Sequence, residues 1–83
     1  MSARLREVEI APEAIDRMVL DNSTEDEDAA IFDMIKELAA GRVTGYRIPF
    51  YTPETYRIDV GRFRIHYMFK DEKTIWIVFI GAY

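Results

Sequence analysis

The chain contains no cysteine, no repeated or low-complexity segment and no linker long enough to separate two domains. The lack of cysteine excludes disulfide scaffolds, thiolate zinc sites and cysteine nucleophiles. The longest apolar run, residues 75–82, has the length of a strand, whereas a membrane span needs about 18 apolar residues. Because no apolar stretch follows the arginines of the first six residues, we expect no signal peptide and a cytoplasmic location.

What is present is enough for one small folded domain. The 83 residues are 49% hydrophobic and 13% aromatic, a composition that distinguishes the chain from a disordered tail. A chain of this size buries about 60–65% of the surface that its unfolded form exposes, so the core must be thin.

Charge is unevenly distributed along the chain. Residues 1–41 hold 4 basic and 11 acidic side chains, a net charge of −7, and residues 42–83 hold 7 basic and 4 acidic side chains, a net charge of +3. This division fits two faces with different partners. It fits equally well a chance result of acidic first turns on helices and arginines on strands.

The first half of the chain has the pattern of a strand followed by two helices. Residues 6–10 alternate as a strand does, and Pro12 suits the first position of a helix that extends to about Leu20. The residues spaced for the core face of this first helix are Ile15, Met18 and Val19.

The second helix has signals at both ends. Thr24 and Glu27 have the spacing of a capping box, and Gly41 is the residue type that ends helices in a left-handed conformation. The residues spaced for its core face are Ile31, Met34, Ile35 and Leu38. The acidic first turn lacks the glycine and the final glutamate of a calcium loop. We therefore expect no metal site, and nothing elsewhere in the sequence indicates a cofactor.

The second half predicts an antiparallel meander. Residues 43–53 look irregular because glycine and proline interrupt them. Strict alternation begins at Tyr56, Gly61-Arg62 suits a two-residue type II′ turn, and a second turn at 71–74 precedes a final strand at 75–82. That strand is apolar on both sides, which predicts a central and covered position. The fold class is α+β, in the order strand, helix, helix and three antiparallel strands.

The apolar side of this meander is expected to meet the second helix. The strand residues predicted to pack there are Tyr56, Ile58, Ile65, Tyr67, Trp76 and Val78. A slip of one residue in register would turn these side chains to the opposite face.

The same register gathers a different set of side chains on the face away from the helices. This set comprises Arg57, Asp59, Arg64, His66, Phe79 and Tyr83. The cross-strand pairs expected from the two turns are Asp59 with Arg64, Arg57 with His66, His66 with Phe79, and Arg62 with Tyr83.

This face has the residue types of RNA chemistry. Arginine binds phosphate and stabilises a charged transition state, histidine moves protons near neutral pH, and aromatic rings stack on exposed bases. A simpler interpretation also fits. Asp59 and Arg64 can form an ordinary cross-strand ion pair worth less than about 1 kcal/mol, and His66 can be an ordinary surface residue.

The segment from Tyr56 to the last residue resembles the RelE/ParE toxin superfamily, and the strand before the first helix extends the resemblance to nearly the whole chain. Members carry Tyr-Arg, a glycine turn, an aromatic residue followed by Arg, then Tyr, an acidic turn and an apolar strand ending in Gly. The residues that match this pattern are Tyr56, Arg57, Gly61, Phe63, Arg64, Tyr67, Asp71, Glu72 and Gly81.

The resemblance implies two helices packed on an antiparallel sheet with one added edge strand. It also implies the toxin of a bacterial toxin–antitoxin pair, which a cognate antitoxin protein holds inactive. The RelE-like branch cleaves mRNA in the ribosome without a metal. The ParE-like branch inhibits DNA gyrase and is not a nuclease.

The resemblance assigns Arg64 to the scissile phosphate and Arg57 to a basic position on the preceding strand. His66 and Tyr83 are the candidate proton-transfer groups. The predicted catalytic set is therefore Arg64, Arg57, His66 and Tyr83. The chain departs from the nuclease pattern at Asp59, where RelE has a lysine. It is also C-terminally truncated relative to nuclease members, which continue past the glycine that matches Gly81 with Arg or His and a further Tyr.

We expect a RelE-like, ribosome-dependent mRNA endoribonuclease whose partners are an antitoxin, the ribosome and mRNA, with no membrane partner. Two alternatives remain open: a ParE-like gyrase inhibitor, and a degenerate member that binds only protein. Asp59, the missing C-terminal motif and the net charge of −4 favour these alternatives, because ribosomal RNA repels an acidic protein unless its positive face is segregated.

Overall fold

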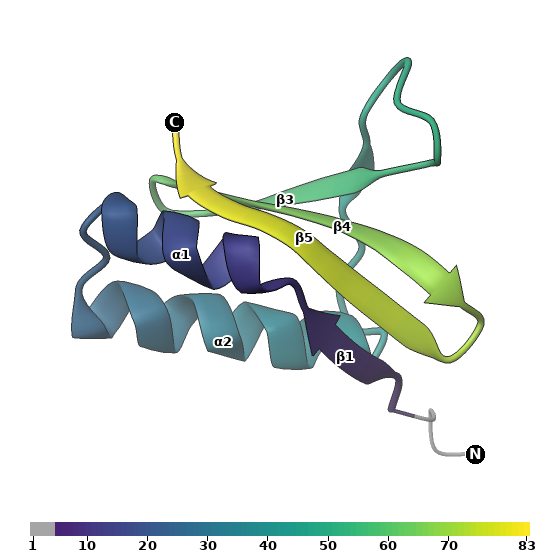
Figure 1. Ribbon diagram of the computed structural model, residues 1–83. Helices are drawn as coiled ribbons and strands as arrows, with labels where there is room; N and C mark the ends of the chain where they lie inside the picture. Colours follow the sequence, from purple (N-terminus) through teal and green to yellow (C-terminus); the bar gives the residue numbers. More distant parts are fainter. Residues whose placement is uncertain (1–4) are drawn as a thin grey trace.

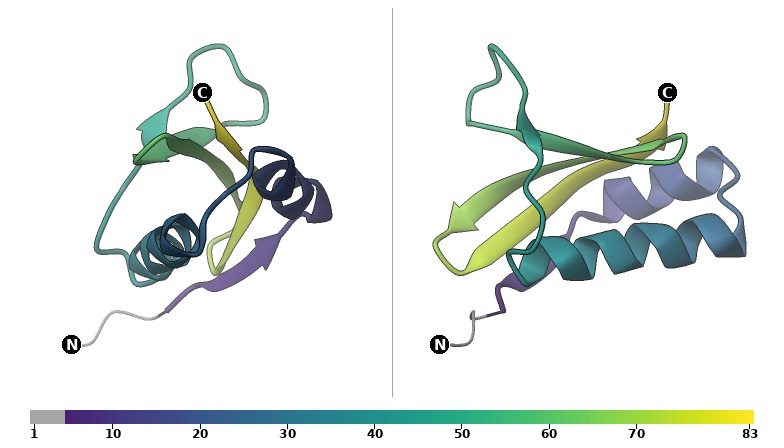
Figure 2. Two further views of the ribbon diagram at one scale, coloured as in Figure 1. Left: turned by 90° about the vertical axis from the view of Figure 1, so that its left-hand side faces the viewer. Right: turned by 180° about the vertical axis from the view of Figure 1, so that it is seen from behind.

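The computed structural model describes residues 5–83 and shows two helices packed on one face of a five-stranded mixed sheet, an α+β architecture (Figure 1; Figure 2). The first four residues, part of the segment considered above for a signal peptide, lie outside the described range. Within that range, neither helix is long and apolar enough to cross a membrane. The elements are β1 (Glu7–Ile10), α1 (Pro12–Leu20), α2 (Glu25–Ala39), β2 (Tyr46–Arg47), β3 (Tyr56–Val60), β4 (Phe63–Asp71) and β5 (Thr74–Ala82).

The sheet has the strand order β1-β5-β4-β3-β2. Strands β3, β4 and β5 form the predicted antiparallel meander, but β1 pairs with β5 in parallel. The prediction of a purely antiparallel sheet is therefore wrong at β1. A strand of four residues shows alternation but not direction, so the sequence pattern could not distinguish the two kinds of partner.

Helix α2 has the predicted signal at each end. The Thr24 hydroxyl accepts a hydrogen bond from the Glu27 N–H at 3.1 Å, and the Glu27 carboxylate accepts one from the Thr24 N–H at 3.0 Å. After the helix, Gly41 has a φ of +74°, and the Arg42 N–H donates to the Glu37 carbonyl at 3.0 Å. The predicted core face is confirmed, with buried Ile31, Ile35 and Leu38 and partly buried Met34.

Helix α1 turns a different face to the core than the sequence predicts. Ala14 and Met18 are buried, whereas Ile15 is 37% exposed and Val19 is 69% exposed. Ala14 has a small side chain, so α1 can lie close against β5 with Ala14 at the contact. The prediction is right for Met18 and wrong for Ile15 and Val19.

The β3–β4 hairpin has the predicted register. Asp59 pairs with Arg64, and Arg57 pairs with His66. The turn begins at Gly61 with a φ of +59°, while Arg62 is not among the residues with positive φ. This combination is a type II′ turn, as the Gly61-Arg62 pair predicts.

The pairing of β4 with β5 contains two irregularities that the sequence does not predict. His66 pairs with Phe79 as expected, but the next pair is Tyr67 with Ile77, which leaves Val78 as an extra residue on β5. A second shift at Lys70 restores the register before the turn.

The bulge at Val78 decides which side of the last strand is buried. A bulge changes the alternation of the side chains beyond it, so Ile75 and Ile77 enter the core and Trp76 is 38% exposed. The prediction that Trp76 and Val78 pack on the helices is wrong for this reason. Strand β5 is an interior strand, paired with β1 and β4, but only one of its faces is covered by helices (Figure 2).

Strand β2 forms inside the stretch predicted to be irregular. Tyr46 and Arg47 pair with β3 in the antiparallel sense. The preceding Gly45 donates its N–H to the Tyr67 hydroxyl at 2.7 Å, and a Cβ at position 45 would lie 2.5 Å from the Arg57 carbonyl oxygen. Glycine therefore permits this edge of the sheet to close. The segment 48–55 that follows rises on the side of the sheet away from the helices (Figure 2).

Candidate functional site

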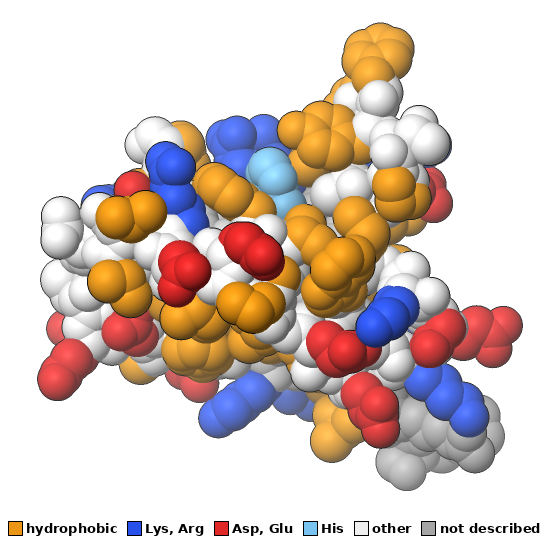
Figure 3. All heavy atoms as spheres, viewed as in Figure 1, with side chains coloured by type: hydrophobic (Ala, Val, Ile, Leu, Met, Phe, Trp, Pro, Cys, Tyr) orange, Lys and Arg blue, Asp and Glu red, His pale blue; other side chains and the backbone are white. Residues whose placement is uncertain are grey.

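The sheet face opposite the helices brings together all four predicted site residues. Arg57 lies on β3, Arg64 and His66 lie on β4, and Tyr83 follows β5. The Tyr83 ring is 4.3 Å from the Arg64 guanidinium carbon, and the Tyr83 N–H donates to the Arg62 carbonyl as the register predicts. Figure 3 shows the histidine ring between basic and hydrophobic side chains. We call this surface, made of Arg57, Asp59, Arg64, His66, Phe79 and Tyr83, the open face.

Three nitrogen atoms of the open face are buried without a hydrogen-bond partner: Arg57 Nε, Arg64 Nε and His66 Nε2. Among residues 5–83, the same holds for one further buried side-chain atom, Asp28 Oδ1 on α2. A buried polar group left unpaired costs about 1–3 kcal/mol, so most such groups are satisfied. Three of them on neighbouring positions of β3 and β4 make this face the candidate site. An anion with several oxygen atoms, such as a phosphodiester, satisfies the two guanidinium donors, and an unprotonated His66 Nε2 is satisfied by a hydroxyl that donates to it.

Asp59 lies between the two arginines without satisfying their buried nitrogens. Its Oδ1 is 3.4 Å from Arg64 Nε, and its Oδ2 is 3.7 Å from an Nη of Arg57. The Arg64 contact has ion-pair distance but not hydrogen-bond geometry, so Arg64 Nε remains an unpaired donor. Two guanidinium groups against one carboxylate leave a net positive charge on this part of the face.

The environment of His66 keeps the imidazole neutral. Burial lowers the pKa of His66 from its usual 6.5, the charges of Arg64 and Arg57 lower it further, and Asp59 opposes them. At pH 7 the side chain is therefore in the form that accepts a proton. Because its Nε2 is covered, a substrate atom reaches that nitrogen only after a neighbouring side chain moves.

Two aromatic rings contact the imidazole. The Phe79 ring centre is 4.9 Å away with the two ring planes at 41°, and the Tyr51 ring centre is 6.4 Å away with the two planes at 89°. Phe79 is predicted from the register, but Tyr51 is not, because residues 43–53 have no periodicity that could orient them. The signal that could have identified this segment is the adjacent aromatic pair Phe50-Tyr51 between two prolines.

Arg62, on the same hairpin, has a structural role that the sequence does not reveal. Its Nε donates to the Glu27 carboxylate at 2.6 Å, and one Nη donates to the same carboxylate at 3.0 Å. That Nη also donates to the carbonyls of Asp21 and Asn22 at 3.1 and 3.2 Å. The hydrogen bond from Arg62, together with that from the Thr24 N–H, lowers the pKa of Glu27 to about 2. These contacts fasten the hairpin to the start of α2.

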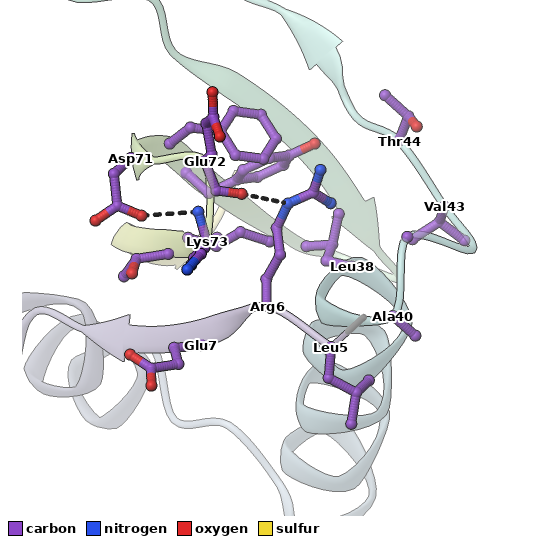
Figure 4. A pocket seen from close by; sticks show the side chains of 15 residues that line it. Leu5, Arg6, Glu7, Leu38, Ala40, Val43, Thr44, Asp71, Glu72 and Lys73 are labelled. Carbon is purple, nitrogen blue, oxygen red and sulfur yellow. Dashed lines mark hydrogen bonds between the residues drawn. The ribbon is translucent and has the colours of Figure 1, made fainter. Parts of the chain in front are cut away.

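A separate cavity of about 1110 Å³ opens between β1, the C-terminal end of α2 and the β4–β5 turn (Figure 4). Its polar groups bind one another: Arg6 Nε donates to the Glu72 carbonyl at 3.4 Å, and the Lys73 N–H donates to the Asp71 carboxylate at 2.7 Å. No predicted site residue lines this cavity, and none of its described lining residues has an unpaired buried side-chain atom. The open face is therefore the better defined site.

In the described part of the chain, no group of three or more histidine, aspartate or glutamate side chains is placed to hold a metal ion. Compared with known proteins, the chain matches no protein-family model, and no curated protein matches it in sequence.

Proposed function

We propose that the open face binds the phosphodiester backbone of single-stranded RNA. The protein is then the toxin of a bacterial toxin–antitoxin pair, a RelE-like endoribonuclease that cleaves mRNA on the ribosome in the cytoplasm. The observation that carries this proposal is the cluster of three buried, unpaired nitrogens on Arg57, Arg64 and His66. The resemblance of the hairpin and last strand to the RelE/ParE pattern supports the same assignment.

The side chains of the open face have the functional groups for a cleavage that uses no metal. The 2′-hydroxyl oxygen of the RNA attacks the adjacent phosphorus, its proton passes to neutral His66, and the bond from phosphorus to the 5′ oxygen breaks. The products are a 2′,3′-cyclic phosphate and a 5′-hydroxyl, whose proton comes from the Tyr83 hydroxyl. Water then restores the proton of Tyr83 and removes the one on His66.

The two arginines have separate roles in this scheme. Arg64 grips the reacting phosphate and stabilises the charge that develops on its oxygens, a role that the planar guanidinium fills better than an ammonium group. Arg57, opposite His66, binds a neighbouring phosphate and positions the strand.

Induced expression in bacteria tests the proposal. Wild type is expected to arrest growth and to cut mRNA in stalled ribosomes, and Arg64→Ala is expected to do neither. Arg42→Ala is the matched control, because this substitution removes the same charge at a place away from the open face. Arg42 follows α2, and its side chain is 63% exposed. If Arg64→Ala is as toxic as wild type, the site assignment is wrong.

One observation favours a second candidate, a ParE-like gyrase inhibitor or a degenerate protein-binding member. Asp59 lies 3.4 Å from Arg64 and 3.7 Å from Arg57, and a carboxylate there weakens the attraction for phosphate. Growth arrest without mRNA cleavage would favour the gyrase inhibitor. A harmless wild-type protein would favour the degenerate member.

The proposed partner is an antitoxin with a basic or apolar segment. The first turn of α2 carries four carboxylates, and α1 exposes the apolar side chains Ile15, Val19 and Leu20. Co-expression with the neighbouring reading frame is expected to raise the soluble yield and to give a complex that co-purifies. A stable monomer whose yield is indifferent to that neighbour would contradict this partner.

A further inference from the structure

Phe50, between β2 and β3, combines two unusual features. Its side chain is 104% exposed, so the ring makes almost no contact with its own fold. Its φ is +66°, a conformation that bulky side chains disfavour. Among residues 5–83, one other non-glycine residue has positive φ, Asn22, and asparagine tolerates that conformation. A disfavoured backbone that holds an aromatic ring in solvent indicates that the ring contacts something outside the chain.

The position of this ring connects it to the open face. The next residue, Tyr51, has its ring centre 6.4 Å from that of His66, so the segment 48–55 rises beside the open face (Figure 1; Figure 2). Tyr46 pairs directly with Arg57 and therefore points to the same side of the sheet, where it is 78% exposed. At the other end of the face, the Tyr83 ring lies on Arg64. Exposed aromatic rings thus border the arginine and histidine groups at both ends.

We infer that residues 48–55 form an arm that stacks on unpaired bases of the RNA strand, with Phe50 and Tyr51 as the stacking rings. The inference rests on the proposed function and adds the part that arginines do not supply, contact with the bases. Single-stranded RNA presents phosphates and free base faces together, and proteins that hold it combine guanidinium groups with exposed aromatic rings. A duplex hides its base faces, so the substrate class is unpaired RNA. A protein partner is less suited, because Arg57 and Arg64 leave buried donors that phosphate oxygens satisfy.

The arm also links RNA binding to the surroundings of His66. In this structure Nε2 of His66 is buried, with Tyr51 against one side of the ring and Phe79 against another. When Tyr51 stacks on a base, its ring leaves the imidazole, and one of the two rings that flank His66 is removed. Binding of an unpaired base and a change in the surroundings of the proton acceptor are then one movement.

Affinity measurements on the full chain separate base stacking from phosphate binding. The probes are a ten-nucleotide 2′-O-methyl RNA, which lacks the nucleophile and cannot be cleaved, and an abasic strand of the same length. The main variant is Phe50→Asn, because asparagine tolerates the backbone at position 50. Phe50→Tyr keeps the stacking ring, and Leu20→Ala, which removes an exposed side chain on α1, is the control.

Phe50→Asn is expected to bind the base-bearing strand about 5- to 150-fold more weakly than wild type, the range for loss of one stacked base. Its affinity for the abasic strand is expected to equal that of wild type. The midpoint temperature of its thermal unfolding should not fall. Phe50→Tyr and Leu20→Ala should bind both strands as wild type does. Arg64→Ala should weaken both strands, because it removes a phosphate contact.

If Phe50→Asn bound the base-bearing strand as tightly as wild type does, the inference that the arm stacks on bases would be wrong. The proposed function would survive that result if Arg64→Ala still weakened both strands. If the Phe50→Asn protein bound RNA normally but no longer co-purified with the antitoxin, the stacking role would also be wrong. Phe50 would then be a contact to the protein partner. If wild type bound neither strand, the arm and the proposed function would both be wrong.

Discussion

Arg62 and Arg64 stand two residues apart on one hairpin, yet their environments are opposite. Arg62 donates four hydrogen bonds, two to the Glu27 carboxylate and two to carbonyls at the turn between the helices. Arg64 has a buried Nε without a hydrogen bond, an aspartate at 3.4 Å and a tyrosine ring over its guanidinium. A donor that folding uses has its partner within the fold, whereas a donor that folding leaves unpaired has no partner there to give up when a ligand binds.

The same contrast extends along β4. Phe63, Ile65 and Tyr67 are at most 1% exposed and pack toward the helices. Arg64 and His66, between them in the sequence, point to the other side and carry the unpaired nitrogens. Because side chains alternate along a strand, one segment supplies both the core and the candidate site. Substitutions on the two faces should therefore have separable effects on stability and on binding.

The largest effect is expected on the covered face. Leu38 is 3% exposed, and Leu38→Ala should lower the free energy of unfolding by about 2–5 kcal/mol, because it removes buried apolar surface and leaves a cavity. Urea denaturation measures this change. A loss well below that range would mean that the core relaxes to fill the space.

The two arginines provide the most direct way to break the comparison. Arg62→Ala should lower the urea midpoint, because the hairpin loses its attachment to α2 and Glu27 loses its partner. Arg64→Ala should leave the midpoint nearly unchanged, because the removal of a buried unpaired donor offsets the loss of the contacts with Asp59 and Tyr83. Equal destabilisation by both variants would contradict the division into a structural and a ligand-binding arginine.

Acid should weaken the Arg62 attachment in a defined range of pH. The hydrogen bond from Arg62, with a smaller contribution from the Thr24 N–H, holds the pKa of Glu27 at about 2 in the folded protein, below the ordinary value of 4.5. The unfolded chain therefore takes up the proton first, and stability is lost as the pH falls from 4.5 towards 2. Across this range, the free energy of unfolding should depend less on pH for Glu27→Gln than for wild type. Identical pH dependence in the two proteins would show that the attachment is not formed.

A smaller pH effect is expected from the open face. Burial and the charges of Arg64 and Arg57 lower the pKa of His66 in the folded protein, although Asp59 opposes them, so the unfolded chain binds the proton more tightly. Stability should therefore decline as the pH falls below 6.5 and through the lower folded pKa. His66→Asn should lose this component of the pH dependence. If it does not, the imidazole is not held neutral by its surroundings.

The sequence was a sufficient guide where one residue type fixes a local geometry. The Gly61-Arg62 pair predicts the turn, and the alternation of apolar and polar residues then sets the register of the two strands. These two features place Arg57, Arg64 and His66 together. The capping pair Thr24 and Glu27 likewise predicts the start of α2. In these cases the controlling interactions are within a few residues of one another, so pattern and spacing are enough.

The features that the sequence did not predict depend on contacts between distant segments. The bulge at Val78 carries no residue-type signal, and it reverses the expected orientation of Trp76. The direction of β1 depends on β5 at the other end of the chain. The contact of Tyr51 with His66 depends on a loop without periodicity. The unpaired state of the open-face nitrogens is likewise visible only when all neighbours are in place.

The central claim is that Arg64 is a phosphate-binding residue, and the salt dependence of RNA affinity tests it most directly. Each phosphate contact on a single strand contributes a slope of about −0.7 to the logarithm of affinity against the logarithm of salt concentration. The account predicts that Arg64→Ala reduces the magnitude of this slope by about 0.7 relative to wild type, while Arg42→Ala leaves it unchanged. The same slope for wild type and Arg64→Ala, or an equal reduction in both variants, would contradict it.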